Sequence, residues 1–167
     1  MVNINYSRYQ LSGLLTLRLL AGWHFLYEGL IKAVNPDWTS AGFLLDSGGP
    51  MAGLFRTLAS DPSVLAVVDF LNVWGLIAIG LGLITGCLTR VALVSGMILL
   101  GFYYLSHPPG VAVRYATPSE GSYLWVNKNL IQVAALFVLY HFPTERIYGI
   151  DRFIFGRKRK QEYYDEQ

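Results

Sequence analysis

Four long apolar segments divide the chain, and shorter stretches rich in proline, glycine and polar residues separate them. The apolar segments cover residues 10–33, 64–85, 91–105 and 123–140. A helix needs about 20 mostly apolar residues to cross the hydrocarbon core of a bilayer. The pattern therefore predicts an all-α protein: an integral membrane four-helix bundle that forms a single transmembrane domain over residues 1–167.

The first connection, residues 34–63, has its own hydrophobic pattern. Asn35-Pro36 ends the first span, because the residue before a proline is disfavoured in the helical conformation. Gly48-Gly49-Pro50 separates a short helix ending at Leu45 from a second one over residues 51–59. Both short helices are apolar on one side, so we expect an interfacial helical hairpin at the membrane surface.

The other connections differ in length. Residues 86–90 predict a tight turn between antiparallel helices, and residues 106–121 predict a proline-rich ordered loop. Aromatic side chains of residues 102–104 are expected in the interfacial belt at the end of the third span. Pro143 ends the fourth span, and residues 144–167 predict an amphipathic basic tail.

Positive charge sets the expected orientation. Cytoplasmic segments next to spanning helices carry an excess of lysine and arginine. The run Arg157-Lys-Arg-Lys160 is therefore expected in the cytoplasm, and four spans place the N-terminus with Arg8 on the same side. The two long loops then lie outside. This arrangement predicts a multi-pass membrane protein with both termini cytoplasmic.

Composition agrees with a lipid environment. Hydrophobic residues make up 53% of the chain, charged residues 14%, and the mean hydropathy is +0.39; soluble domains carry about 25% charged residues. A net charge of +2 gives no basis for a nucleic-acid partner. Cys87 is the single cysteine, which excludes an intrachain disulfide or dithiol relay. The sequence has no metal, haem or flavin signature.

Ionisable residues inside a membrane are costly and usually functional. His24, Glu28 and Lys32 follow at four-residue intervals and form one stripe on the first span. Counted from the span ends, the polar residues of three spans lie at a similar depth in the outer half of the bilayer. The candidate catalytic residues are His24, Glu28, Asp69 and Lys128. The candidate substrate-binding residues are Arg18, Lys32, Asn72, His107, Arg114 and Asn129.

Each candidate also has a structural interpretation. Glu28 and Lys128 would form an ion pair that fixes the bundle, because an unpaired buried charge costs several kcal/mol (about 3–5). Lys32 would extend its ammonium group to the surface, and Arg18 would anchor backbone carbonyls. The asparagines would act as interhelical hydrogen bonders. The sequence leaves open whether the cluster is a site or a structural network.

Short motifs resemble the DoxX/DoxD-like family of four-helix membrane proteins. They are Arg18-Leu-Leu-Ala-Gly22, Asn72-Val-Trp-Gly75, Gly80-Leu-Gly-Leu-Ile-Thr-Gly86 and Trp125-Val-Asn-Lys-Asn129, and the second and fourth look closest to the DoxD branch. The resemblance implies a subunit of a thiosulfate:quinone oxidoreductase, which passes electrons from thiosulfate outside the membrane to quinone within it. A second membrane or periplasmic subunit is an implied partner, and a bacterial or archaeal cytoplasmic (inner) membrane is the implied location.

The candidate residues are compatible with that chemistry. Thiosulfate is a dianion, which cationic residues near the outer side would attract (Lys32, His107, Arg114 and Lys128). Quinone, the expected electron acceptor, needs protons that acid–base groups would supply (His24, Glu28 and Asp69). Two other functions stay open: a membrane anchor or scaffold for a partner protein, and a small solute or lipid transporter. Glycines at 75, 80, 82 and 86 permit close helix contact within the chain or across a homodimer.

Overall fold

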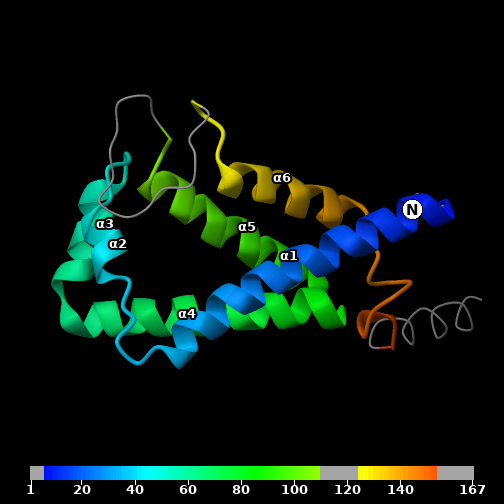
Figure 1. Ribbon diagram of the computed structural model, residues 1–167, viewed down its shortest axis with the longest axis horizontal. Helices are drawn as coiled ribbons and strands as arrows, with labels where there is room; N and C mark the ends of the chain where they lie inside the picture. Colours follow the sequence, from blue (N-terminus) through cyan, green and yellow to red (C-terminus); the bar gives the residue numbers. More distant parts are fainter. Residues whose placement is uncertain (1–5, 110–123, 154–167) are drawn as a thin grey trace, which may run out of the picture.

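The computed structural model describes residues 6–109 and 124–153, and these residues form an all-helical structure (Figure 1). Four helices are long: α1 (Arg8–Val34), α4 (Pro62–Thr85), α5 (Thr89–Ser106) and α6 (Lys128–His141). Two are short and follow α1: α2 (Ala41–Leu45) and α3 (Ala52–Ser60). The prediction of an all-α protein is confirmed for the described residues.

Local sequence signals explain where the helices begin. Ser7 and Gln10 form a capping box at the start of α1, in which each side chain accepts a hydrogen bond from the other residue's backbone N–H. Asp61 caps α4 just before Pro62. Proline is favoured in the first turn of a helix, because its missing N–H would have no partner there.

The last long helix begins later than the apolar pattern predicts. Residues 123–140 were expected to be helical, but α6 begins at Lys128. Leu124 has a φ of 61°, which a right-handed helix does not permit. Asn127 then caps the helix by accepting a hydrogen bond from the backbone N–H of Leu130. The helix has 14 residues, which gives it a length of about 21 Å.

The four long helices pack as a closed ring. Helix α1 contacts α4 and α6, and α5 contacts the same two helices. Glycines allow α1 and α4 to approach closely: a Cβ atom at Gly80 would lie 2.5 Å from the backbone nitrogen of Leu26, and one at Gly29 would lie 2.7 Å from Ile77. At least Gly80 therefore serves contacts within the chain. Ten buried residues, Phe25, Leu83, Leu93 and Leu136 among them, form the core.

Much of the outer surface is apolar. Helices α4 and α5 are long and apolar enough to cross a membrane, and only 22% and 33% of their most apolar stretches are buried inside the protein. Phe70 and Trp74 on α4 are both more than half exposed. A core helix of a soluble protein would bury such side chains. The exposed apolar surface is therefore typical of contact with lipid.

The helices define two ends of the molecule. The hairpin end holds α2, α3 and the beginnings of α4 and α6 (Figure 1). The tail end holds the beginning of α1, the turn between α4 and α5, and residues 144–153 (Figure 1). These two names are used below because the polar residues gather at the two ends in separate groups.

Candidate functional site

Lys32 lies at the hairpin end, in the last turn of α1, and is half-buried. Its Nζ donates a hydrogen bond of 3.0 Å to Oδ1 of Asn72 on α4. The same ammonium group lies 5.0 Å from the centre of the Trp38 ring and 5.7 Å from that of Tyr103. Two aromatic faces therefore stabilise its charge by cation–π attraction.

Asn72 extends this contact to a third helix. Its Nδ2 donates a hydrogen bond of 2.6 Å to the hydroxyl oxygen of Tyr103 on α5. The Lys32–Asn72–Tyr103 chain thus joins α1, α4 and α5 through side chains alone. Sequence analysis identified Lys32 and Asn72 but assigned Tyr103 to the interfacial belt, because nothing in the local pattern shows that its hydroxyl meets Asn72.

The Lys32–Asn72–Tyr103 series of hydrogen bonds does not use all the donors of its members. An ammonium group has three N–H donors, and Lys32 uses one of them on Asn72. The Tyr103 oxygen accepts from Asn72, so its own O–H is directed elsewhere. Within residues 6–109 and 124–153, no acceptor is described for the other two N–H donors of Lys32 or for the O–H of Tyr103.

Two further charged candidates act on Lys32. Glu28 lies one turn earlier on α1 and attracts the ammonium group, while Lys128 at the start of α6 repels it. Among the described residues, the acid–base contact with an N···O distance within 4 Å is the one between Asp46 and His107. The structure therefore brings Glu28, Lys32 and Lys128 into electrostatic range, without the direct Glu28–Lys128 ion pair given above as the structural interpretation.

Asp69 has a different role at the hairpin end. Its carboxylate accepts hydrogen bonds from the backbone N–H of Ser40, at 2.8 Å, and from the Ser40 hydroxyl. Ser40 precedes α2 and is buried. Asp69 therefore fastens the beginning of α2 to α4.

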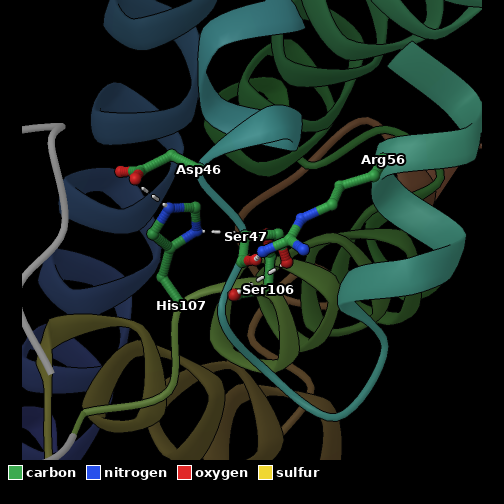
Figure 2. Close-up of polar contacts among 5 residues, drawn as sticks. All are labelled: Asp46, Ser47, Arg56, Ser106 and His107. Atoms are coloured by element: carbon green, nitrogen blue, oxygen red, sulfur yellow. Dashed lines mark hydrogen bonds and ion pairs between the residues drawn. The ribbon is translucent and has the colours of Figure 1, made fainter. Parts of the chain in front are cut away.

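His107 forms a second polar group at this end, beside α2 (Figure 2). Its Nε2 lies 3.6 Å from Oδ2 of Asp46, and its Nδ1 lies 3.0 Å from the Ser106 hydroxyl. Phe43 stacks on the imidazole at 4.1 Å. Burial lowers the pKa of His107, and the nearby Asp46 opposes that shift only in part. The ring is therefore neutral at pH 7, and it offers hydrogen bonding rather than the positive charge expected from the sequence.

Backbone contacts fix the hairpin on α5. The carbonyl oxygen of Ser106 accepts hydrogen bonds from the Ser47 hydroxyl at 3.0 Å and from the backbone N–H groups of Gly48 and Gly49 at 3.1 Å each. Figure 2 shows Arg56 of α3 reaching back to Ser47, where its Nη2 donates to the carbonyl oxygen at 2.8 Å. Gly49 is required, because a Cβ atom there would lie 1.8 Å from the Leu105 carbonyl oxygen.

An aromatic wall connects the two polar groups. The Phe43 ring, stacked on His107, meets the Tyr103 ring edge to face at 5.6 Å. The Trp38 ring also lies next to the Lys32 ammonium group. The hairpin end therefore combines flat aromatic surfaces with the donors of Lys32 and Tyr103, which suits a planar molecule with oxygen atoms at its edge.

Other predicted site residues lie apart from this group. His24 is half-buried in the middle of α1, and its ring meets Phe25 at 6.2 Å. Asn129 is half-buried in the first turn of α6. Arg114 lies outside the described residues. Among the described residues, no hydrogen bond or ring contact joins His24 or Asn129 to Lys32, Asn72 or Tyr103.

Arg18 is distant from the other candidates, because fourteen residues of α1 separate it from Lys32, about 21 Å. It is 2% exposed at the tail end. Its Nη1 donates to the Thr144 hydroxyl at 3.0 Å, and its Nη2 donates to the Tyr148 carbonyl oxygen at 2.6 Å. These contacts match the anchor interpretation of Arg18: the side chain ties α1 to residues 144–148.

The sequence does not predict the second polar group at the tail end, which lies around Asp151. The Asp151 carboxylate accepts hydrogen bonds from the backbone N–H groups of Leu88, at 2.8 Å, and Thr89, at 2.9 Å. Asp151 thus caps α5 from a distant part of the chain. Nearby Glu145 is 4% exposed, and burial raises the pKa of its carboxyl group above the ordinary value. Both acids were included in an amphipathic tail with no individual role.

Comparison with known proteins adds no relative. No family model, no curated protein and no solved structure matches the chain.

Proposed function

We propose that the chain is a multi-pass membrane protein spanned by α1, α4, α5 and α6, with the tail end in the cytoplasm of a bacterial or archaeal cell. Exposed arginines at the tail end support this orientation by the positive-inside rule: Arg8, Arg90, Arg146 and Arg152. The exposed apolar surface of α4 and α5 supports the spans. Cysteine labelling tests this orientation. Single cysteines are introduced at Asp37 or at Arg152 in a Cys87→Ser background and treated with an impermeant maleimide. The cysteine at position 37 should be labelled in intact spheroplasts, and the one at position 152 should be labelled in inverted vesicles.

We further propose that this protein is a subunit of a quinone-linked oxidoreductase that acts on thiosulfate or a related sulfur compound, as the DoxX/DoxD-like resemblance implies. One observation carries the proposal: Lys32 and Tyr103 have donors with no acceptor among the described residues, and the ring of Trp38 lies beside the first and that of Phe43 beside the second. A quinone head group is planar and carries carbonyl oxygens at its edge. Donors beside aromatic faces are what such a head group requires.

Each residue has an assigned task. The Lys32 ammonium group and the Tyr103 hydroxyl donate to a quinone carbonyl, and Asn72 holds both in position. Glu28, one turn before Lys32, is the acid–base group that exchanges protons in the reaction. Quinone takes up two electrons and two protons. Two thiosulfate ions supply one electron each and join through a new S–S bond, and the two protons come from water by way of Glu28. Lys128, exposed at the start of α6, attracts the sulfur anion to this end.

Quinone binding by the purified chain tests the site directly. Quenching of tryptophan fluorescence by a short-chain quinone gives its Kd. Lys32→Met removes a charged donor and should raise the Kd by about 10- to 150-fold, since such hydrogen bonds contribute about 1.5–3 kcal/mol. Tyr103→Phe removes a neutral donor and should raise it by about 2- to 10-fold. Tyr104→Phe is the matched control, because its hydroxyl donates to the Trp125 carbonyl oxygen instead.

Thiosulfate-dependent quinone reduction then tests the reaction. The wild-type chain should catalyse it, alone or with a co-purifying subunit, and Lys32→Met should lose it. Equal quinone affinity in wild type, Lys32→Met and Tyr103→Phe would refute the assigned site.

We also propose a second function, a scaffold for a partner protein, because the hairpin is rigidly docked. Ser106 and Asp69 hold it to α5 and α4, so the hairpin presents a preformed surface. A partner that co-purifies in a fixed ratio with the wild type, but not with Gly49→Ala, while quinone does not bind, would favour the scaffold.

A further inference from the structure

An apolar groove lies between α4 and α5 at the tail end. It is a shallow, open depression with a volume of about 470 Å³. Its lining includes Leu81, Gly82, Leu88, Val91, Ala92 and Ile150. The groove is therefore distinct from the Lys32–Asn72–Tyr103 site, which lies at the opposite end of α4 and α5.

The groove suits a flexible hydrocarbon chain. Gly82 and Ala92 form the floor of the groove. They pack closely, because a Cβ atom at Gly82 would lie only 3.0 Å from the Cβ of Ala92. The rim side chains Leu88 and Val91 are more than half exposed. Thr85 lines the groove too, but its hydroxyl already donates to the Leu81 carbonyl oxygen at 2.7 Å. The groove thus presents mainly apolar surface.

Positive charge surrounds the groove's end of the molecule. Four arginines are exposed there, at positions 8, 90, 146 and 152. The acids of the same region, Glu145 and Asp151, are buried, and Asp151 is engaged by backbone N–H groups. Arg152 follows Ile150, a lining residue, by two positions, and Phe153 beside it is 76% exposed. A cation and an exposed aromatic ring therefore follow a lining residue of the groove within three positions along the chain.

We propose that this groove binds one anionic phospholipid, with an acyl chain between α4 and α5 and its phosphate group on Arg152. Charge complementarity selects the occupant: an apolar groove in a cationic, lipid-facing end fits a molecule with a hydrocarbon chain and a negative head group. The proposal rests on the membrane placement proposed above, but not on the quinone site.

Native mass spectrometry of the detergent-purified full chain tests the proposal. Phosphatidylglycerol and phosphatidylcholine with identical acyl chains are added at equal concentrations, and the bound fractions give the two affinities. The wild type should bind phosphatidylglycerol about fivefold more tightly for the one arginine, which corresponds to about 1 kcal/mol. Arg152→Gln should remove that preference. Lys128→Gln, an exposed cation at the hairpin end, should leave it unchanged.

A second variant tests the groove itself. Val91→Trp fills it from the exposed rim and should weaken binding of both lipids at least fivefold, whereas Val67→Trp, exposed on α4 outside the groove, should not. Equal affinity for the two lipids, a preference retained in Arg152→Gln, or unchanged binding in Val91→Trp would overturn the proposal. A dimer of the chain that excludes lipid and is lost in Val91→Trp would overturn it as well. Because no quinone is present, failure here leaves the quinone site unaffected.

Discussion

Asp151 gives the sharpest test of the energetics of this fold. Its carboxylate accepts hydrogen bonds from two backbone N–H groups at the start of α5, at 2.8 and 2.9 Å, and its side chain is 6% exposed. Asp61 makes a similar pair of contacts at the start of α4, to the N–H groups of Ser63, at 2.8 Å, and Val64, at 3.3 Å, but it is exposed. The two aspartates therefore form a matched pair that differs mainly in burial.

The expected magnitudes follow from that difference. Removing an exposed N-cap typically costs about 1 kcal/mol, because water replaces the lost acceptor. Asp151→Ala leaves two amide groups without acceptors, the Thr89 N–H in a buried place and the Leu88 N–H in a partly buried one. Each such buried group costs about 1–3 kcal/mol. We therefore expect a loss of about 3 kcal/mol in the free energy of unfolding for Asp151→Ala and about 1 kcal/mol for Asp61→Ala. Asp151→Asn keeps one acceptor oxygen and should fall between the two.

Reversible unfolding in mixed micelles at pH 7, followed by tryptophan fluorescence, measures all three variants on one scale. The linear dependence of the free energy of unfolding on denaturant gives the differences, provided the slopes agree. Losses for Asp151→Ala and Asp61→Ala that agree within about 0.5 kcal/mol would refute the argument, since surface substitutions away from specific contacts also stay within about that range.

Three further predictions concern the two ends of the molecule. Gly49→Ala should destabilise the protein by about 3 kcal/mol in the same assay, because its Cβ would meet the Leu105 carbonyl oxygen, whereas Gly42→Ala, with no atom within 4 Å, should be neutral or slightly stabilising. His107 has a lowered pKa in the folded protein. The free energy of unfolding should therefore be highest above about pH 6.5, the pKa in the unfolded chain, and should fall as the pH drops below that value. In His107→Asn, melting temperatures measured against pH should lose this dependence. Glu145 has a raised pKa in the folded protein, so the free energy of unfolding should decline as the pH rises above about 4.5. Glu145→Gln should flatten that decline and should melt at a higher temperature at neutral pH. An unchanged pH profile in His107→Asn or in Glu145→Gln would contradict the pKa shift given for that residue.

Local signals explain the part of the fold that the sequence predicts. Apolar length, Asn35-Pro36 and the Gly48-Gly49-Pro50 break act over a few residues, so they predict five of the six helices near their observed bounds. The beginning of α6 could not be read in the same way. Leu124 adopts a left-handed φ of 61°, which the apolar pattern gives no reason to expect of a leucine.

The site is only half predictable for a related reason. The four-residue spacing on α1 correctly places Glu28 and Lys32 on one face, and depth counting brings Asn72 to the same level. Depth does not say which neighbour a polar group meets. Asp69 turns to Ser40, and Tyr103 joins Asn72, through contacts between helices that no local pattern encodes.

The cap on α5 also orders events during biosynthesis. Leu88 and Thr89 leave the ribosome 63 and 62 residues before Asp151. At about 5–20 residues per second, that interval lasts roughly 3–12 s. Throughout it, the amides at the start of α5 lack their native acceptor. The guanidinium group of Arg18 lacks its partners for most of the interval, until Thr144 and Tyr148 emerge. The α4–α5 pair is therefore translated before its cap, which belongs to a segment made after all four long helices.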